Sequence, residues 1–117
     1  MQILIIINDA PYGTEKAYNA LRLAMSIQKE SPETEVSIFL MADAVGCGLP
    51  NQNTPQGYYN IERMLKSVIL KGSRVKACGG CMDARGLTQE MLIDGVEKSN
   101  MKELTEYTLT ADKVITF

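Results

Sequence analysis

The 117-residue sequence contains no histidine and no tryptophan. Without histidine, a single subunit cannot form a Cys–His or Ser–His catalytic pair, and no imidazole can bind a metal ion. Long apolar runs are absent too, since no stretch approaches the ~20 residues that a membrane-spanning helix needs. The first strongly apolar segment, residues 3–7, follows the start without a basic leader, so we interpret it as a strand and not as a signal peptide.

Neither sign of charge is in large excess, because 12 basic and 14 acidic residues give a net charge of -2. No overall field therefore draws the chain to nucleic acid or to anionic lipid, and we expect neither direct nucleic-acid binding nor membrane association. One stretch between Arg63 and Asp83 carries only basic charges. We interpret it mainly as a solvated helix face.

The cysteine count is small and odd, with three residues of which two are close together. This usage fits the reducing cytosol better than a disulfide framework, so we expect a cytoplasmic protein. The length fits one domain, residues 1–117, and the apolar content of 45% lies within the globular range.

Strand-like and helix-like segments alternate along the chain. The run at residues 3–7 is rich in β-branched residues, as in a strand that is buried on both faces. Helical periodicity begins at about Thr14 and stops at Ser31-Pro32, and a second helix stops at Gly72. Asn100 and Glu103 form a possible capping box, and we expect Met101, Leu104, Thr108 and Ala111 to face inward from that helix. The remaining predicted segments are a strand at 36–41, a loop at 42–60, a helix at 61–69, a strand at 74–77, a helical turn at 88–92, an extended piece at Val96 and a strand at 114–117.

This order predicts an α/β fold, with a doubly wound and mostly parallel sheet of about five strands and helices on both faces. In such sheets, ligands bind outside the carboxyl ends of the strands. That edge, which we call the carboxyl rim, is expected to carry Asn8, Asp9, Asp43 and Cys78.

The segment at residues 77–86 carries most of the chemical information. Cys78 follows a strand and precedes two glycines, which leave room for a bulky sulfur donor or acceptor. Cys81 completes a C-x-x-C motif, a spacing that lowers the pKa of a thiol, as nearby cations do. Lys76 and Arg85 are the available cations, and Asp83 would oppose them.

Each of these residues also has a structural interpretation. A free cysteine often merely fills a core, and Cys81 is either a resolving thiol or a turn residue. Cys47 lies in the long loop and is interpreted as incidental. Asp9 and Asp43 are common turn residues, and Asn8 and Arg85 could equally be hydrogen-bonding loop residues.

Five segments in one order resemble the DsrE/DsrF-like family, in particular its YchN branch, and together they span nearly the whole chain. They are NDAPYG at 8–13, FLMADAV at 39–45, CGGCMDARG at 78–86, LIDGVE at 92–97 and ADKVITF at 111–117.

The resemblance implies a flavodoxin-like subunit that assembles as a trimer or hexamer. It also implies a sulfur-relay protein, in which the cysteine matching Cys78 accepts sulfane sulfur as a persulfide and exchanges it with other sulfur-carrier proteins. Cys81 is shared with the YchN branch, whereas Cys47 matches no family position.

Four hypotheses follow for the function. The first is sulfurtransferase-like persulfide transfer by Cys78, with Cys81 as a second catalytic thiol and with Asn8, Asp9, Asp43 and Arg85 as a supporting rim. The second is a dithiol redox protein that uses both cysteines of the motif. The third is a metal site from Cys47, Cys78, Cys81 and a carboxylate, which is disfavoured without histidine. The fourth is a non-enzymatic oligomeric subunit that binds a small molecule or partner. We expect no metal and no cofactor.

Overall fold

A computed structural model describes all 117 residues and contains one five-stranded sheet. Every neighbouring pair of strands is parallel, and the order across the sheet is β4-β3-β2-β1-β5. The prediction of an α/β fold is confirmed, and the sheet is wholly parallel where a mostly parallel one was expected. The strands are β1 (Gln2–Ile7), β2 (Glu35–Leu40), β3 (Arg74–Cys78), β4 (Val96–Ser99) and β5 (Lys113–Thr116).

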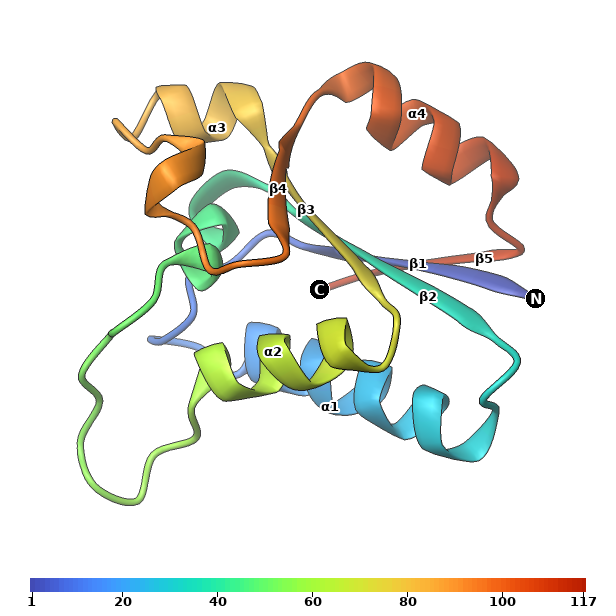
Figure 1. Cartoon of the computed structure of the whole chain (residues 1–117), viewed down its shortest axis with the longest axis horizontal. Helices are drawn as coiled ribbons and strands as arrows, with labels where there is room; N and C mark the ends of the chain where they lie inside the picture. The colour runs from blue at the N-terminus through green and yellow to red at the C-terminus, as the bar shows by residue number, and fades with distance from the viewer.

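Helices cover both faces of this sheet (Figure 1). Two of them, α1 (Lys16–Glu30) and α2 (Ile61–Leu70), lie on one face, and α4 (Met101–Thr110) lies on the other. Right-handed crossovers explain the arrangement, because the chain moves from β1 through β2 and β3 to β4 in one direction and then returns past β1 to β5 in the opposite direction. The sheet is therefore doubly wound, as the order of elements predicted.

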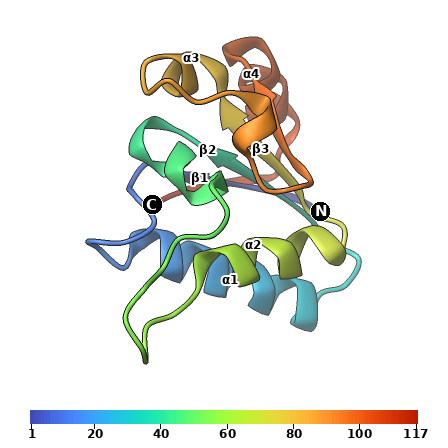
Figure 2. The ribbon, with the colours of Figure 1, turned by 60° about the vertical axis from the view of Figure 1, so that its left-hand side comes forward.

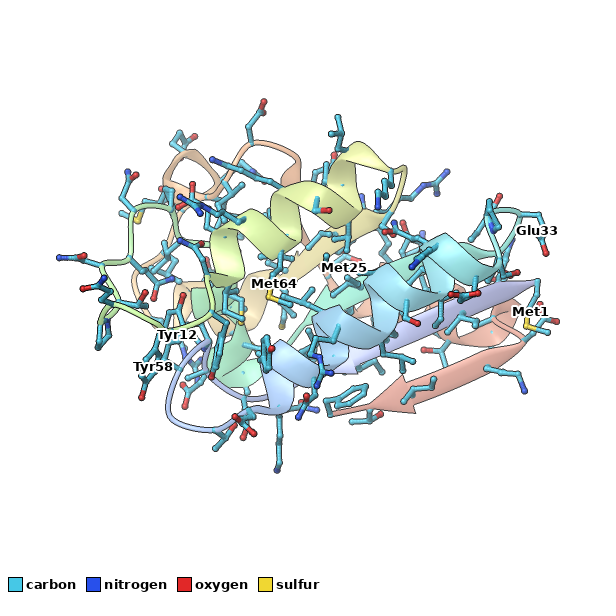
Figure 3. All side chains as sticks on the ribbon, turned by 90° about the horizontal axis from the view of Figure 1, so that it is seen from below. Met1, Tyr12, Met25, Glu33, Tyr58 and Met64 are labelled. Carbon is cyan, nitrogen blue, oxygen red and sulfur yellow. The ribbon has the colours of Figure 1, made fainter.

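The two faces of the sheet carry buried clusters of very different size. Ile5 and Ile38 face the α1 and α2 side, where they belong to a core of 22 buried residues. Leu4 and Phe39 face α4, where only three residues form the buried cluster. Side chains on both faces of β1 are thus buried, which explains its uninterrupted apolar sequence. Seen from below, α1 and α2 lie side by side, with Met25 and Met64 close to each other (Figure 3).

Side-chain caps define the starts of α2 and α4. Asn60 accepts a hydrogen bond from the N–H of Arg63, and Asn100 accepts one from the N–H of Glu103. The expected capping box is only half formed, because the Glu103 carboxylate bonds the hydroxyl of Ser99 instead of returning to the cap. Two of the expected inward residues, Met101 and Thr108, are exposed; Leu104, Tyr107 and Ala111 face the sheet.

Two short helices occupy segments predicted as loops. A 3-10 helix, η1 (Ala42–Gly48), follows β2 and buries Ala44, Val45 and Cys47. Another helix, α3 (Gly79–Asp83), starts directly after β3 and buries Met82. The chain between η1 and α2 extends away from the body of the molecule (Figure 2). None of the helices is both long and apolar enough to cross a membrane.

Candidate functional site

Cys78 lies at the carboxyl end of β3, at the point where the chain turns into α3. It is the last residue of the strand, where it pairs with Ser99 of β4, and it is also the N-cap of α3. The backbone N–H of Cys81, one turn later, donates to Cys78 Sγ at 3.4 Å. Both residues are partly exposed, so the C-x-x-C motif lies at the carboxyl rim and is not buried in the core.

The start of η1, just after the neighbouring strand β2, supplies a second hydrogen bond to this pair. Leu40 of β2 is in register with Ala77 of β3, so the chain leaving β2 passes beside the motif. The N–H of Ala42 donates to Cys81 Sγ at 3.2 Å. Ala42 has a φ of 51°, a left-handed conformation that a non-glycine residue adopts rarely and that is concentrated at functional sites. The sequence analysis did not identify Ala42, because nothing in the sequence indicates that this alanine adopts a positive φ.

Arg85 connects η1 to α3. Its Nε and Nη2 donate to one carboxylate oxygen of Asp43, at 3.0 and 2.8 Å, and its Nη1 donates to the carbonyl oxygen of Cys81 at 3.0 Å. Asp43 and Arg85 were both expected at the rim, and the structure brings them together beside Cys81. The pair is exposed and contributes little stability by itself, and its role in supporting a substrate stays a prediction.

The environment raises the pKa of Cys78. Burial has the largest effect, because a thiolate loses hydration there, and the neighbouring thiol of Cys81 raises the pKa further. The sequence offers Lys76 and Arg85 as cations that would lower this pKa and Asp83 as an opposing charge, and it does not decide between them. In the structure Lys76 pairs with Glu97 at 2.9 Å and Arg85 pairs with Asp43, and burial and Cys81 raise the pKa.

The opposing charge of Asp83 is also paired within the protein. Its carboxylate lies 2.7 Å from the ammonium of Lys98 on β4. The charged groups that flank the motif in sequence are therefore paired with residues of β4 and η1.

The two glycines of the motif have different roles. A Cβ on Gly79 would lie 2.6 Å from the carbonyl oxygen of Ser99, so this residue lets α3 approach β4. A Cβ on Gly80 would meet nothing within 4 Å, so only this glycine leaves open space beside the motif. The sequence interpretation, that both glycines clear the approach to the sulfur, holds for Gly80 alone.

Asn8 and Asp9 follow β1 on the same rim but interact with other segments. Asn8 Nδ2 donates to the carbonyl of Phe117 at 3.4 Å, and the Asp9 carboxylate accepts from the hydroxyl of Thr14 at 3.0 Å. No hydrogen bond or ion pair joins either side chain to Cys78 or Cys81. Their proposed role in supporting a substrate stays a prediction.

Comparison with known proteins identifies the family. The sequence model of the DsrE/DsrF-like family matches residues 1–117. The chain belongs to this family. It is 44% identical to protein YchN of Escherichia coli K12 over 116 residues, which cover 99% of this chain and 98% of YchN. It is 41% identical to protein MJ0989 of Methanocaldococcus jannaschii over 117 residues, which cover both chains completely.

Solved structures agree with this assignment. The crystal structure of the E. coli YchN protein superposes with a TM-score of 0.94, covering 99% of this chain and 98% of that one at 44% identity. Protein MTH1491 of Methanobacterium thermoautotrophicum superposes with a TM-score of 0.74 at 13% identity, covering 99% and 98%, and so shares the fold. None of these relatives carries an activity in its name, so the comparison establishes family and fold but not the reaction.

The third cysteine of this DsrE/DsrF-like chain is sealed in the core. Cys47 is fully buried in η1, and its thiol lies 3.9 Å from the carbonyl oxygen of Asp9. Burial raises its pKa to about 12, so it stays protonated at neutral pH. Nowhere do three or more His, Cys, Asp or Glu side chains form a group that could hold a metal ion.

Burial of Cys47 predicts a loss of stability at alkaline pH. Its pKa is about 12 in the folded protein and 9.0 for the free thiol, so between these values the unfolded chain releases a proton that the folded chain retains. The free energy of unfolding should fall by up to about 1.4 kcal/mol per pH unit in that window. Urea unfolding of the parent and of Cys47→Ala measures the contribution. The variant should show the shallower decline, and parallel declines would contradict this account.

Three surface depressions lie away from the cysteine pair. Those of about 270 and 370 Å³ lie at the opposite end of the sheet, and both are lined by Glu35, Val36 and Gly72. The third, of about 380 Å³, lies beside Tyr58 and Tyr59. None of the three is lined by Cys78 or Cys81, so the cysteine pair lies outside these depressions.

Proposed function

We propose that this protein carries sulfane sulfur as a persulfide on Cys78. The observation that supports the proposal most directly is the position of this thiol, which is partly exposed at the carboxyl end of β3 and has a backbone N–H donor at 3.4 Å. The sulfur is fixed by the strand behind it and remains reachable from outside. Family membership supports the same chemistry, because Cys78 matches the position at which the family resemblance implies a persulfide-forming cysteine.

The proposed reaction consists of two exchange steps. The Cys78 thiolate attacks the outer sulfur of a donor persulfide, the S–S bond of the donor breaks, and the donor leaves as a thiol. An acceptor thiolate then attacks the outer sulfur of the Cys78 persulfide and regenerates Cys78. Neither step changes the net oxidation state, and neither needs a histidine base, because thiolate exchange depends on ionisation and access.

The donor and acceptor are expected to be thiols of other sulfur-carrier proteins. Cys78 lies on the carboxyl rim outside the described depressions, so a thiol carried on the surface of another protein could approach it there. The cytosol is the compartment that would keep the three cysteines reduced.

Assembly into a trimer or hexamer is part of the same proposal. Large apolar side chains are exposed on and next to α4, where Leu109 is 80% and Met101 60% exposed. Contact with another copy of the chain would remove this surface from water.

Loading with glutathione persulfide tests the carrier function. Intact mass analysis of the parent and of Cys47→Ala should show reaction at Cys78, seen as one added sulfur atom or as a product derived from it. Cys78→Ser should show neither. Cys47→Ala is the matched control, since its cysteine is buried.

Equal sulfur uptake by Cys78→Ser would overturn the proposal. Loss of a bound partner in variants of the rim residues Asp43 and Arg85, with Cys78→Ser still binding that partner, would favour a non-enzymatic binding subunit instead.

A further inference from the structure

We infer that Cys81 is a resolving thiol that cleaves the Cys78 persulfide, releases its outer sulfur as sulfide and leaves a Cys78–Cys81 disulfide. This activity rests on the proposed persulfide on Cys78 and goes beyond it, because the protein would then reduce sulfane sulfur as well as carry it. The substrate class is a protein-bound persulfide.

Cys78 and Cys81 lie next to each other at the start of α3, as this reaction requires. Cys78 and Cys81 are separated by one turn, and the N–H of Cys81 already lies 3.4 Å from Cys78 Sγ. Residues three apart on a helical turn are neighbours, within the Cα separation that a disulfide spans. The side chains also interact, since the Cys81 thiol contributes to the raised pKa of Cys78.

Both the side chain and the main chain of Cys81 are held by hydrogen bonds from other segments. Its sulfur accepts a hydrogen bond from the N–H of Ala42 at 3.2 Å, and its carbonyl accepts one from Arg85 at 3.0 Å. Ala42 makes its bond from a left-handed conformation, with φ at 51°. A residue of positive φ at the start of η1 thus holds the side chain of Cys81, and an arginine that follows α3 holds its main chain.

Cys47 cannot take this role. It is fully buried, and its thiol faces the carbonyl oxygen of Asp9. The chain therefore offers one candidate for the resolving residue.

The proposed step balances atoms and electrons. The Cys81 thiolate attacks Cys78 Sγ, the inner sulfur of the persulfide, and the bond from Sγ to the outer sulfur breaks. The outer sulfur leaves with the electron pair and takes up a proton as hydrosulfide. The sulfane sulfur is thereby reduced, and the two cysteines are oxidised to a disulfide. An external dithiol then reduces the disulfide and completes the cycle.

The test loads three proteins with one equivalent of glutathione persulfide without oxygen: the parent, Cys81→Ser and Cys78→Ser. The parent should release about one equivalent of sulfide per subunit and form a disulfide between Cys78 and Cys81. Cys81→Ser should accumulate a stable persulfide on Cys78 and release only the background of sulfide that glutathione generates. Cys78→Ser should do neither. Cys81→Ala replaces Cys81→Ser in the same measurement if the serine variant folds poorly.

Each failure has a different meaning. If the parent and Cys81→Ser retain the same amount of persulfide and release equal sulfide, Cys81 is not a resolving thiol, and the carrier function stands. If neither protein acquires sulfur on Cys78 and the parent forms no disulfide, both proposals are overturned. If Cys78→Ser releases as much sulfide as the parent, the sulfide comes from other chemistry and the inference is wrong.

Discussion

Alkylation of Cys78 by iodoacetamide should accelerate about tenfold with each pH unit from neutral pH to pH 9, because the reacting species is the thiolate. Burial and the Cys81 thiol raise the pKa of Cys78 above its ordinary value of 9.0. The profile should therefore show no plateau below that value. Mass spectrometry of the peptide that contains both cysteines assigns the rate to Cys78.

Removal of the neighbouring thiol should move this profile. In Cys81→Ala the thiol hydrogen bond and the like-charge interaction disappear, whereas burial, the first cause of the shift, remains. The pKa of Cys78 should fall, and its alkylation at neutral pH should become faster than in the parent. A parent that already reaches a plateau near neutral pH, or a variant that reacts more slowly, would contradict the electrostatic description of the pair.

Gly79→Ala should destabilise the protein by about 2 to 3 kcal/mol, because it overpacks a rigid contact. The added Cβ would lie 2.6 Å from the carbonyl oxygen of Ser99, which is backbone of β4 and cannot rotate away. Either α3 or β4 must shift, and Cys78 lies directly before the substituted residue. Urea unfolding gives the free energy, and the alkylation rate of Cys78 shows whether the thiol has moved.

Gly80→Ala is the matched control for this substitution. Its Cβ would contact nothing within 4 Å, and Gly80 is an exposed residue of α3. Alanine is the better helix former by up to about 1 kcal/mol, so the free energy of unfolding should stay unchanged or rise. Equal losses in the two variants would show that the motif needs both glycines for a reason other than the contact with Ser99.

Local patterns predicted most of the elements, because the apolar residues that each strand or helix buries recur with the period of that element. The apolar run at residues 3–7 is β1, and the periodic segment at 61–69 is α2, bounded at Asn60 by a cap that the structure shows. Patterns failed where tertiary contacts override propensity. The glycine-rich start of α3 is a poor helix former, and α3 persists with Met82 fully buried in the core.

The candidate site was predicted in part. The motif indicated Cys78, and the carboxyl-end rule placed Asp43 on the same rim. The contact of Asp43 with Arg85 depends on a distance across 42 residues that no local pattern encodes. The direction of the pKa shift at Cys78 was also beyond sequence reasoning, because it depends on how far the thiol is buried and on its contact with Cys81.

The order of the elements and the segments shared with one family were enough to predict a mostly parallel α/β sheet with a C-x-x-C motif at the end of its third strand. Residue types and their spacing carry that information, since each strand and helix is largely set by its own neighbours in sequence. Tertiary structure alone decided that the N–H of Ala42 meets Cys81, that Gly79 packs on β4 and that Cys47 is sealed in the core. These features arise where separate strands end side by side, so they depend on the register between strands, which the local sequence does not specify.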